Sequence, residues 1–243
     1  MKKKTKVAII GSRGYPYVYS GYETLVKNLA ERLIRNGIEV RVYCHRSLFN
    51  ERPKNLNGIE LVYTPSIETK VLSQFINSFF SFIHLCFSDV DKVLILNTAN
   101  GPFGILTKIF NKKTCINVDG LEWLRPKWKG FGNFYFKIAT KLATVFFDVI
   151  ISDSTEIQKI YKKKYGKESN VIRYGPSLAK TFKSNYLKEK NIQKEQYYLI
   201  VGRLIPDNNV LFIVNSFLKS KSTKKLVVVG DVPYIDNYST KVK

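Results

Sequence analysis

Short apolar runs alternate with longer amphipathic segments along most of the chain. The runs predict seven strands, at residues 7–10, 39–44, 59–63, 92–96, 114–118, 149–152 and 171–173. The segments between them have helical periodicity and predict helices at residues 22–36, 72–87, 103–111, 133–147 and 154–165. Strands that alternate with helices pair in parallel through helical crossovers. The pattern therefore predicts an α/β fold, a Rossmann-like domain built on a doubly wound parallel sheet.

The pattern changes after residue 176. Residues 177–196 are rich in Lys, Asn, Gln and Ser and predict a linker between an N-terminal domain, residues 1–176, and a second domain. Residues 197–201, 208–219 and 225–229 then predict a single strand–helix–strand unit. One such unit leaves both faces of its sheet uncovered. We therefore expect residues 197–243 to be the incomplete start of a second Rossmann-like domain.

The composition is typical of a folded protein in a reducing compartment. Hydrophobic residues make up 44% of the 243 positions, and the three cysteines, Cys44, Cys86 and Cys115, have no paired spacing. A disulfide framework and a structural zinc site are therefore not expected. His45 and His84 are the only histidines, and neither belongs to a metal-ligand or Ser/His/Asp pattern. We predict no metal and no cofactor.

Two segments resemble membrane signals without meeting their requirements. The basic start, MKKKTK, is followed by only four apolar residues, too few for a signal peptide. Residues 71–87 form the longest apolar stretch, but Ser, Gln, Asn and His interrupt it, and it is too short for a convincing membrane span. We expect a cytoplasmic protein.

The net charge points to anionic partners. The chain contains 40 Lys and Arg against 19 Asp and Glu, a formal charge of +21. An excess of this size favours nucleic acid, an anionic membrane face or phosphorylated small molecules, and it also promotes solubility. The charge alone leaves these readings open.

The first strand leads into a glycine-containing loop, GSRGYPYVYSGYET. Its glycines follow the pattern G-x-x-G, and the helix begins only near Gly21, unlike the dinucleotide fingerprint G-x-G-x-x-G. The acidic residue expected after the second strand is also missing, although Arg46 there keeps an NADP site open. Ser20 and Gly21 indicate a helix N-terminus that favours an anionic group, or a capped turn without a ligand.

Further candidates follow later strands, where ligands of doubly wound sheets bind. Asp119, Glu122 and Trp123 lie in DGLEW, directly after the strand at 114–118. The next segment mixes basic and aromatic residues, and we favour a membrane-contact role over a core helix or a nucleic-acid platform; its members are Arg125, Lys127, Trp128, Lys129, Lys137 and Lys141. In the second domain, Arg203 in VGRLIPDNN is a candidate diphosphate clamp.

Together these motifs resemble family 4 glycosyltransferases of the GT-B fold, and specifically the bacterial β-1,4-rhamnosyltransferase subgroup. The matching stretches are GSRGYPYVYSGYETLVKNLA, INVDGLEWLRPKW, DVIISDSTEIQ, VIRYGPS, LIVGRLIPDNN and LVVVGD. The resemblance implies two Rossmann-like domains, a retaining reaction and no divalent metal. It implies a nucleotide-sugar donor such as dTDP-rhamnose, a lipid-diphosphate-linked saccharide acceptor and an anionic membrane surface as partners, and no nucleic acid.

The resemblance also implies roles for individual residues. Asp119 would be catalytic beside the sugar ring. Donor binding is expected of Gly14, Gly21, Arg203 and Asn208, and acceptor binding of Arg13, Glu23, Glu122 and Trp123. The chain departs from the family at Ser20, where a second glycine is usual. The acidic motif that grips the ribose lies beyond residue 243 in the family, so we expect these 243 residues to be inactive alone.

Two other functions remain as alternatives. One is an NADP-dependent or nucleotide-sugar-modifying Rossmann enzyme, which the loop after the first strand permits. The other is a basic nucleic-acid-binding module, which the charge of +21 permits.

Overall fold

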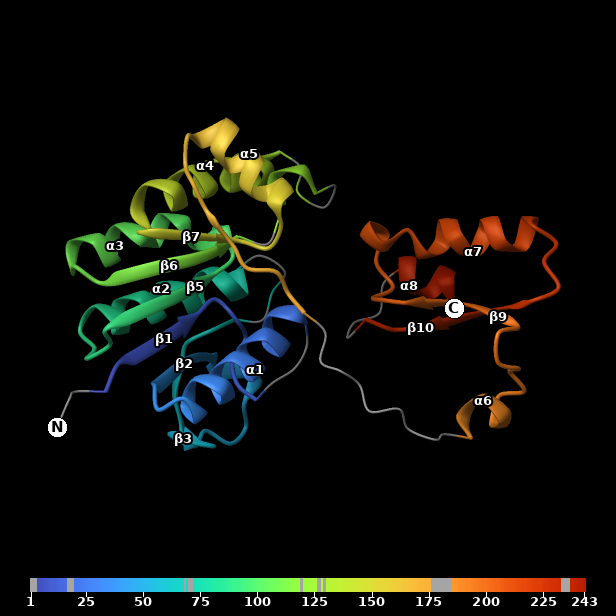
Figure 1. The fold of residues 1–243 in the computed structure, drawn as a ribbon, viewed down its shortest axis with the longest axis horizontal. Helices are drawn as coiled ribbons and strands as arrows, with labels where there is room; N and C mark the ends of the chain where they lie inside the picture. Colours follow the sequence, from blue (N-terminus) through green and yellow to red (C-terminus); the bar gives the residue numbers. More distant parts are fainter. Residues whose placement is uncertain are drawn as a thin grey trace. The chain divides into compact units, whose positions relative to one another are not determined.

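The fold is seen in a computed structural model (Figure 1). It describes residues 4–16, 20–67, 69, 72–118, 120–125, 128, 130–175, 185–232 and 237–243. The chain divides into two compact units, and each is described by itself. The first unit is formed by Met1–Leu124 and Trp128–Gly175, and the second mainly by Pro176–Lys243.

The first unit contains an eight-stranded sheet. Its strands are β1 Lys6–Ile10, β2 Glu39–His45, β3 Asn55–Leu56, β4 Ile59–Thr64, β5 Lys92–Leu96, β6 Lys113–Val118, β7 Val149–Ser152 and β8 Asn170–Val171. They follow the order β3-β4-β2-β1-β5-β6-β7-β8, and only the β3–β4 pair is antiparallel. The sequence prediction of a doubly wound α/β sheet is confirmed.

Helices cover the two faces of this sheet. They are α1 Gly21–Arg35, α2 Leu72–Cys86, α3 Gly104–Ile109, α4 Phe131–Phe146 and α5 Thr155–Tyr165, with 3-10 turns at Arg46–Leu48, Thr98–Phe103 and Glu122–Leu124. Alternate residues of β1 point to opposite faces. Ile9 packs in the core cluster that includes residues of α1, whereas Ala8 and Ile10 pack in the cluster that includes residues of α2, α4 and α5.

The predicted elements of the first unit differ from the observed ones mainly at their ends, but the two-residue strand β3, Asn55–Leu56, has no predicted counterpart. The strands at Lys92–Leu96 and Val149–Ser152 are as predicted. The helix predicted at 103–111 is shorter, because a 3-10 segment with an internal proline, Thr98–Phe103, precedes it. The last strand is Asn170–Val171 rather than 171–173. Helix α1 begins within one residue of its predicted start, since Ser20 and Glu23 form a capping box there.

The second unit is smaller. Its elements are α6 Tyr186–Glu189, β9 Tyr197–Val201, a 3-10 turn at Pro206–Asn208, α7 Val210–Lys219, β10 Lys225–Val229 and α8 Asn237–Val242. Strands β9 and β10 pair in parallel from Tyr197 opposite Lys225 to Val201 opposite Val229. The predicted linker contains the short helix α6, and α7 starts two residues late because Asn209 is left-handed, at a φ of 52°.

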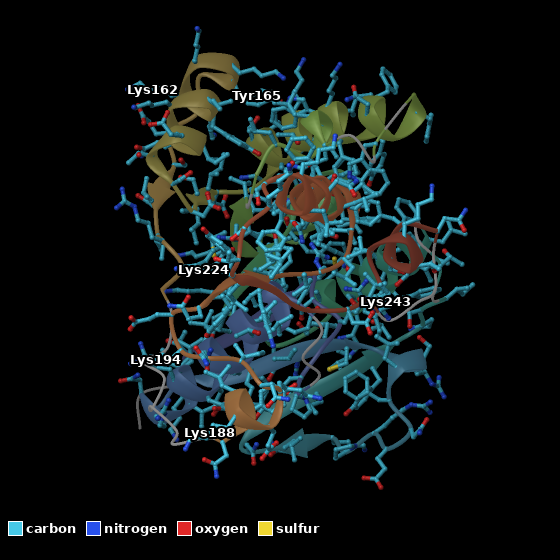
Figure 2. All side chains as sticks on the ribbon, turned by 90° about the vertical axis from the view of Figure 1, so that its right-hand side faces the viewer. Lys162, Tyr165, Lys188, Lys194, Lys224 and Lys243 are labelled. Carbon is cyan, nitrogen blue, oxygen red and sulfur yellow. The ribbon has the colours of Figure 1, made fainter. Side chains whose placement is uncertain are left out.

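Much of the surface of the two strands in the second unit is exposed to solvent. Tyr198, Leu199, Val201 and Val229 are all exposed. At the start of β10, Lys224 donates from its Nζ to the Glu195 carbonyl at 3.0 Å and lies 5.9 Å from the ring of Tyr198 (Figure 2). The apolar runs that predicted these strands are therefore present without the cover that the first unit provides.

Candidate functional site

The carboxyl ends of the parallel strands bring together the loops that the sequence singled out in the first unit. The loop after β1 begins at Gly11, the loop after β5 at Asn97 and the described part of the loop after β6 at Gly120. Adjacent parallel strands end at the same edge, and β1, β5 and β6 are neighbours in the sheet. This edge is the candidate site.

A buried carboxylate closes the loop after β1. Glu23, 2% exposed, accepts from the Arg13 N–H through Oε1 at 2.9 Å and from the Ser20 N–H through Oε2 at 2.9 Å. The Ser20 hydroxyl also donates to Oε2. Glu23 therefore ties both ends of the described loop to the first turn of α1. A negative charge already at this helix end opposes binding of a second anion there.

The two glycines predicted to bind the donor differ in their surroundings. Gly14 has a φ of +126°, and a Cβ on it would lie 2.7 Å from the Cys44 Sγ, so packing within the protein explains this glycine. A Cβ on Gly21 would meet no atom of the described residues within 4 Å. Within the described part of the chain, Gly21 therefore leaves open space at the start of α1. Burial raises the pKa of the Cys44 thiol to about 12, which keeps it uncharged and unreactive.

The loop after β6 is fastened by its own polar groups. Asp119 lies outside the described residues, and Gly120 follows with a φ of +142°. The Trp128 indole donates to Glu122 Oε2 at 2.8 Å, and both Glu122 and Trp123 are buried. The Asn133 side chain donates to the Trp123 carbonyl. The carboxylate and the indole predicted for an acceptor thus point into the protein.

Trp123 is held from the side of α5. Lys164 Nζ lies 4.3 Å from the centre of its ring, and the ring of Tyr165 lies edge-on at 6.2 Å. Figure 2 shows Tyr165 on α5, next to Lys162. Only 5% of the Trp123 residue surface is exposed. The Trp123 side chain is therefore packed inside the protein and stabilises the loop after β6.

The basic and aromatic segment divides into a packed and an exposed part. Trp128 packs on Phe136, with ring centres 4.8 Å apart, and Arg125 is half-buried. Lys137 and Lys141 are exposed on α4, together with Phe131 at 82% and Phe134 at 59%. Lys127 and Lys129 lie outside the described residues. The outer face of α4 thus combines lysines with bare aromatic rings.

The candidate clamp in the second unit lies in the turn after β9. Arg203 is exposed, and its carbonyl accepts from the Asn208 side-chain amide at 2.8 Å. Gly202 and Gly230 end the paired strands in close contact, since a Cβ on Gly230 would lie 1.8 Å from the Gly202 carbonyl oxygen. Asn208 therefore shapes the turn, and the guanidinium of Arg203 is presented outside it.

One residue at the edge escaped the sequence analysis. Tyr174 follows β8, and its hydroxyl donates to Asn117 Oδ1 at 2.6 Å, beside the start of the loop that contains Asp119. The signal for it is its place directly after the strand predicted at residues 171–173, within the motif VIRYGPS.

The described residues contain no cluster of three or more His, Cys, Asp or Glu side chains able to hold a metal ion. No helix in the described ranges has both the length and the hydropathy to cross a bilayer.

Solved structures share this fold at low identity. Sucrose-phosphate synthase from Thermosynechococcus elongatus has a TM-score of 0.78 and 13% identity, over 98% of this chain and 65% of that one. HepE from Anabaena, in complex with UDP and glucose, has a TM-score of 0.66 and 15% identity, over 96% and 62%. A glycosyltransferase from Rickettsia africae has a TM-score of 0.65 and 16% identity, over 100% and 64%.

These likenesses show that the fold is that of GT-B glycosyltransferases. The chain spans less than two thirds of the length of each of the three structures, 62% to 65%. No curated protein sequence matches it. Residues 4–177 match the family described as "Domain of unknown function (DUF1972)", which is well over half of the 243 residues. The chain therefore belongs to the DUF1972 family.

Proposed function

We propose that the whole protein is a glycosyltransferase that passes a sugar from a nucleotide-sugar donor to a saccharide acceptor. The observation that carries the proposal is the carboxyl edge of a GT-B sheet, with a loop closed by Glu23 and an open Gly21. The finer assignment rests on the motif resemblance. It is transfer of rhamnose from dTDP-rhamnose or a similar donor to a lipid-diphosphate-linked saccharide, in bacterial cell-surface polysaccharide synthesis.

On the donor side, the two units have different tasks. The Glu23 carboxylate opposes phosphates at the start of α1, so the open surface at Gly21 suits the uncharged sugar ring better. Arg203 is exposed and suits the diphosphate, with Asn208 holding its turn. A fixed cation stabilises the charge of the leaving diphosphate, and the proposed reaction needs no metal for that purpose. We propose that it retains the anomeric configuration.

On the acceptor side, we propose that Arg13 contacts the saccharide. Glu23, Glu122 and Trp123 are buried, so their contribution is to hold the two loops in place. Gly14 has the same supporting task against Cys44. Asp119 keeps its proposed place beside the reacting sugar because it follows β6 at the same edge.

The proposed location is the cytoplasmic face of a membrane that contains the lipid-linked acceptor. The exposed Lys137 and Lys141 on α4, next to Phe131 and Phe134, support contact with anionic headgroups. Each basic residue near such a surface contributes about 1 kcal/mol of attraction.

A transfer assay tests the proposal. The whole protein, rather than these 243 residues alone, is incubated with a panel of nucleotide sugars and a lipid-diphosphate saccharide, and products are separated by mass. Transfer from one donor, reduced about 100-fold or more by Asp119→Asn at unchanged melting temperature, is the expected result. Tight NADPH binding without any donor response would favour a Rossmann oxidoreductase instead. Steeply salt-dependent binding to single-stranded nucleic acid, without transfer, would favour the nucleic-acid module.

A further inference from the structure

Helix α2 has apolar side chains on two sides. Its sheet-facing side buries the polar residues Ser73, Asn77 and Ser81 together with Phe82 and Leu85. Phe75, Phe79 and Phe80 are exposed on the other side. A surface helix normally has polar residues on its solvent-facing side. An exposed apolar stripe of this length indicates a partner that covers it.

Hydrogen bonds to the strand ends fix this orientation. The Asn77 amide donates to the Cys44 carbonyl at 3.3 Å and to Thr64 Oγ1 at 2.7 Å. Ser81 Oγ lies 2.8 Å from Thr64 Oγ1. Rotating the helix to bury its aromatic side would leave these buried groups without partners, which is costly. The aromatic side therefore faces outward as part of the fold.

The exposed rings continue onto α3. Phe87, 78% exposed, meets Phe110 edge-on with ring centres 5.2 Å apart, and Ile109 next to it is 69% exposed. Helices α2 and α3 are in contact, and α3 in turn contacts α4. We call this surface the aromatic face, formed by Phe75, Phe79, Phe80, Phe87, Ile109 and Phe110.

The charged side chains on the helices of the aromatic face and on α4 are all positive, although two carboxylates lie at the margin. Asp148 pairs with Lys108 at 2.7 Å, and Asp89 lies near Phe87. Helices α2, α3 and α4 contain no Asp or Glu, whereas Lys108 lies on α3, and Lys137 and Lys141 lie on α4. A second copy of this chain would bring the same positive charges together, on a protein whose formal charge is +21. An apolar surface beside lysines is complementary to a bilayer with anionic headgroups.

We propose that the aromatic face inserts into the interfacial layer of an anionic bilayer. Strand β4 ends at the candidate edge, and α2 leads back from there to the start of β5. A docked α2 therefore has its N-terminal end next to the candidate edge, while Phe87 and Phe110 contact the membrane near the starts of β5 and β6. This inference rests on the proposed membrane association but not on the transfer reaction, and it assigns the apolar contact to α2 and α3 rather than to α4.

Vesicle co-sedimentation of the full chain tests the inference. The vesicles contain phosphatidylcholine with about one third phosphatidylglycerol, and binding is compared with pure phosphatidylcholine. We expect Phe79→Ser with Phe80→Ser and Phe87→Ser to weaken binding to the anionic vesicles at least tenfold. The matched control is Phe212→Ser with Leu218→Ser, which removes exposed apolar side chains from the second unit and should change binding less than twofold.

A second measurement does not depend on loss of binding. Phe79→Trp is prepared alongside Phe212→Trp, and quenching by lipids brominated in the acyl chain is compared. Strong quenching at position 79 and none at position 212 supports the inference. Equal quenching at the two positions, or wild-type binding by the triple Phe variant, overturns it. Loss of binding only with Lys137→Gln and Lys141→Gln would keep the membrane association and refute the aromatic face. A dimer in solution that the triple variant dissociates would assign the face to a second copy.

Discussion

The two units contain similar apolar strands that end in different environments. Leu96 lies in β5 within the run KVLIL and is fully buried, at 0% exposure. Leu199 lies in β9 within the run YYLIV and is 53% exposed. Both strands pair in parallel, but β5 has a neighbour on each side, β1 and β6, whereas β9 pairs with β10 alone in the described residues. The difference arises from the additional strands and from the helices, which cover both faces of the sheet in the first unit.

This comparison separates what forms a strand from what stabilises it. An apolar run and a parallel neighbour suffice to form β9 and β10. The free energy that stabilises the folded state comes mainly from removing apolar surface from water, and little apolar surface is removed from water around Leu199. The first unit therefore has a stable frame for its loops, and the second presents Arg203 on a less supported one.

The largest expected effect compares two leucines. Leu96→Ala should lower the free energy of unfolding of the first unit by about 2–5 kcal/mol, because it opens a cavity in a closed core. Leu199→Ala should cost less than about 1 kcal/mol in the second unit. Hydrogen exchange measured by mass spectrometry reports each unit separately. Equal losses of protection would show that β9 is as well covered as β5.

The next effect compares two glycines within the site. Gly14→Ala should lower the stability of the first unit by about 2–4 kcal/mol, because the φ of +126° and the Cys44 side chain both resist a Cβ. Gly21→Ala should leave stability within about 1 kcal/mol of wild type, since its Cβ meets none of the described residues within 4 Å. Urea unfolding followed by tryptophan fluorescence measures this, because both tryptophans, Trp123 and Trp128, belong to the first unit. A stable Gly14→Ala variant would contradict the packing role.

The topology could be predicted from the sequence, but the roles of Gly14 and Gly21 could not. Apolar runs and helical periodicity depend on neighbours along the chain, so they predicted the parallel sheet correctly. Whether Gly14 meets Cys44 depends on how β2 lies beside β1, which no local pattern contains. In the sequence, Gly14 and Gly21 are both glycines of the loop after the first strand, and nothing in the pattern separates their roles.

The orientation of α2 shows a second limit. Ser73, Asn77 and Ser81 recur at helical spacing, and the default expectation places such a stripe in water. The stripe is instead buried because it hydrogen bonds to groups at the carboxyl ends of β2 and β4. A sequence shows that polar groups share a face but not which partners they find.

A smaller effect compares the first loop of each unit. Glu23→Gln should destabilise the first unit by about 1–3 kcal/mol. The amide oxygen can accept from only one of the Arg13 and Ser20 N–H groups, and the amide nitrogen that faces the other cannot accept. Asn208→Ala should cost the second unit about 0.5–1 kcal/mol, since it removes one exposed hydrogen bond to the Arg203 carbonyl. Exchange of the loop amides is the measurement. The reverse ranking would mean that the Arg203 turn is the more firmly held of the two.

The smallest effect concerns acid, and it again separates the units. In the first unit, Arg41 pairs with Glu60 at 2.8 Å and with Asp89 at 2.9 Å, and Lys6 contacts both carboxylates. The hydrogen bond from Lys6 lowers the pKa of Asp89. Burial tends to raise the pKa of Glu60, but the hydrogen bonds from Arg41 and Lys6 outweigh it, so that this pKa is also lowered.

A lowered pKa in the folded state means that the unfolded chain binds these protons first. The stability from each carboxylate is therefore complete above its unfolded pKa, near 4, and is lost as the pH falls through the folded value. Because both groups are partly exposed, we expect no more than about 1 kcal/mol from each pair. Carbon-detected NMR titration of the two carboxyl groups is the direct measurement, and Arg41→Met should move both midpoints up toward ordinary values.

In the second unit, Lys243 lowers the pKa of Asp231, yet that pair is exposed, and Lys243→Met should not change unfolding measurably at any pH. Midpoints for Glu60 and Asp89 at or above those of free side chains would show that the network joining β1, β2 and β4 contributes no stability.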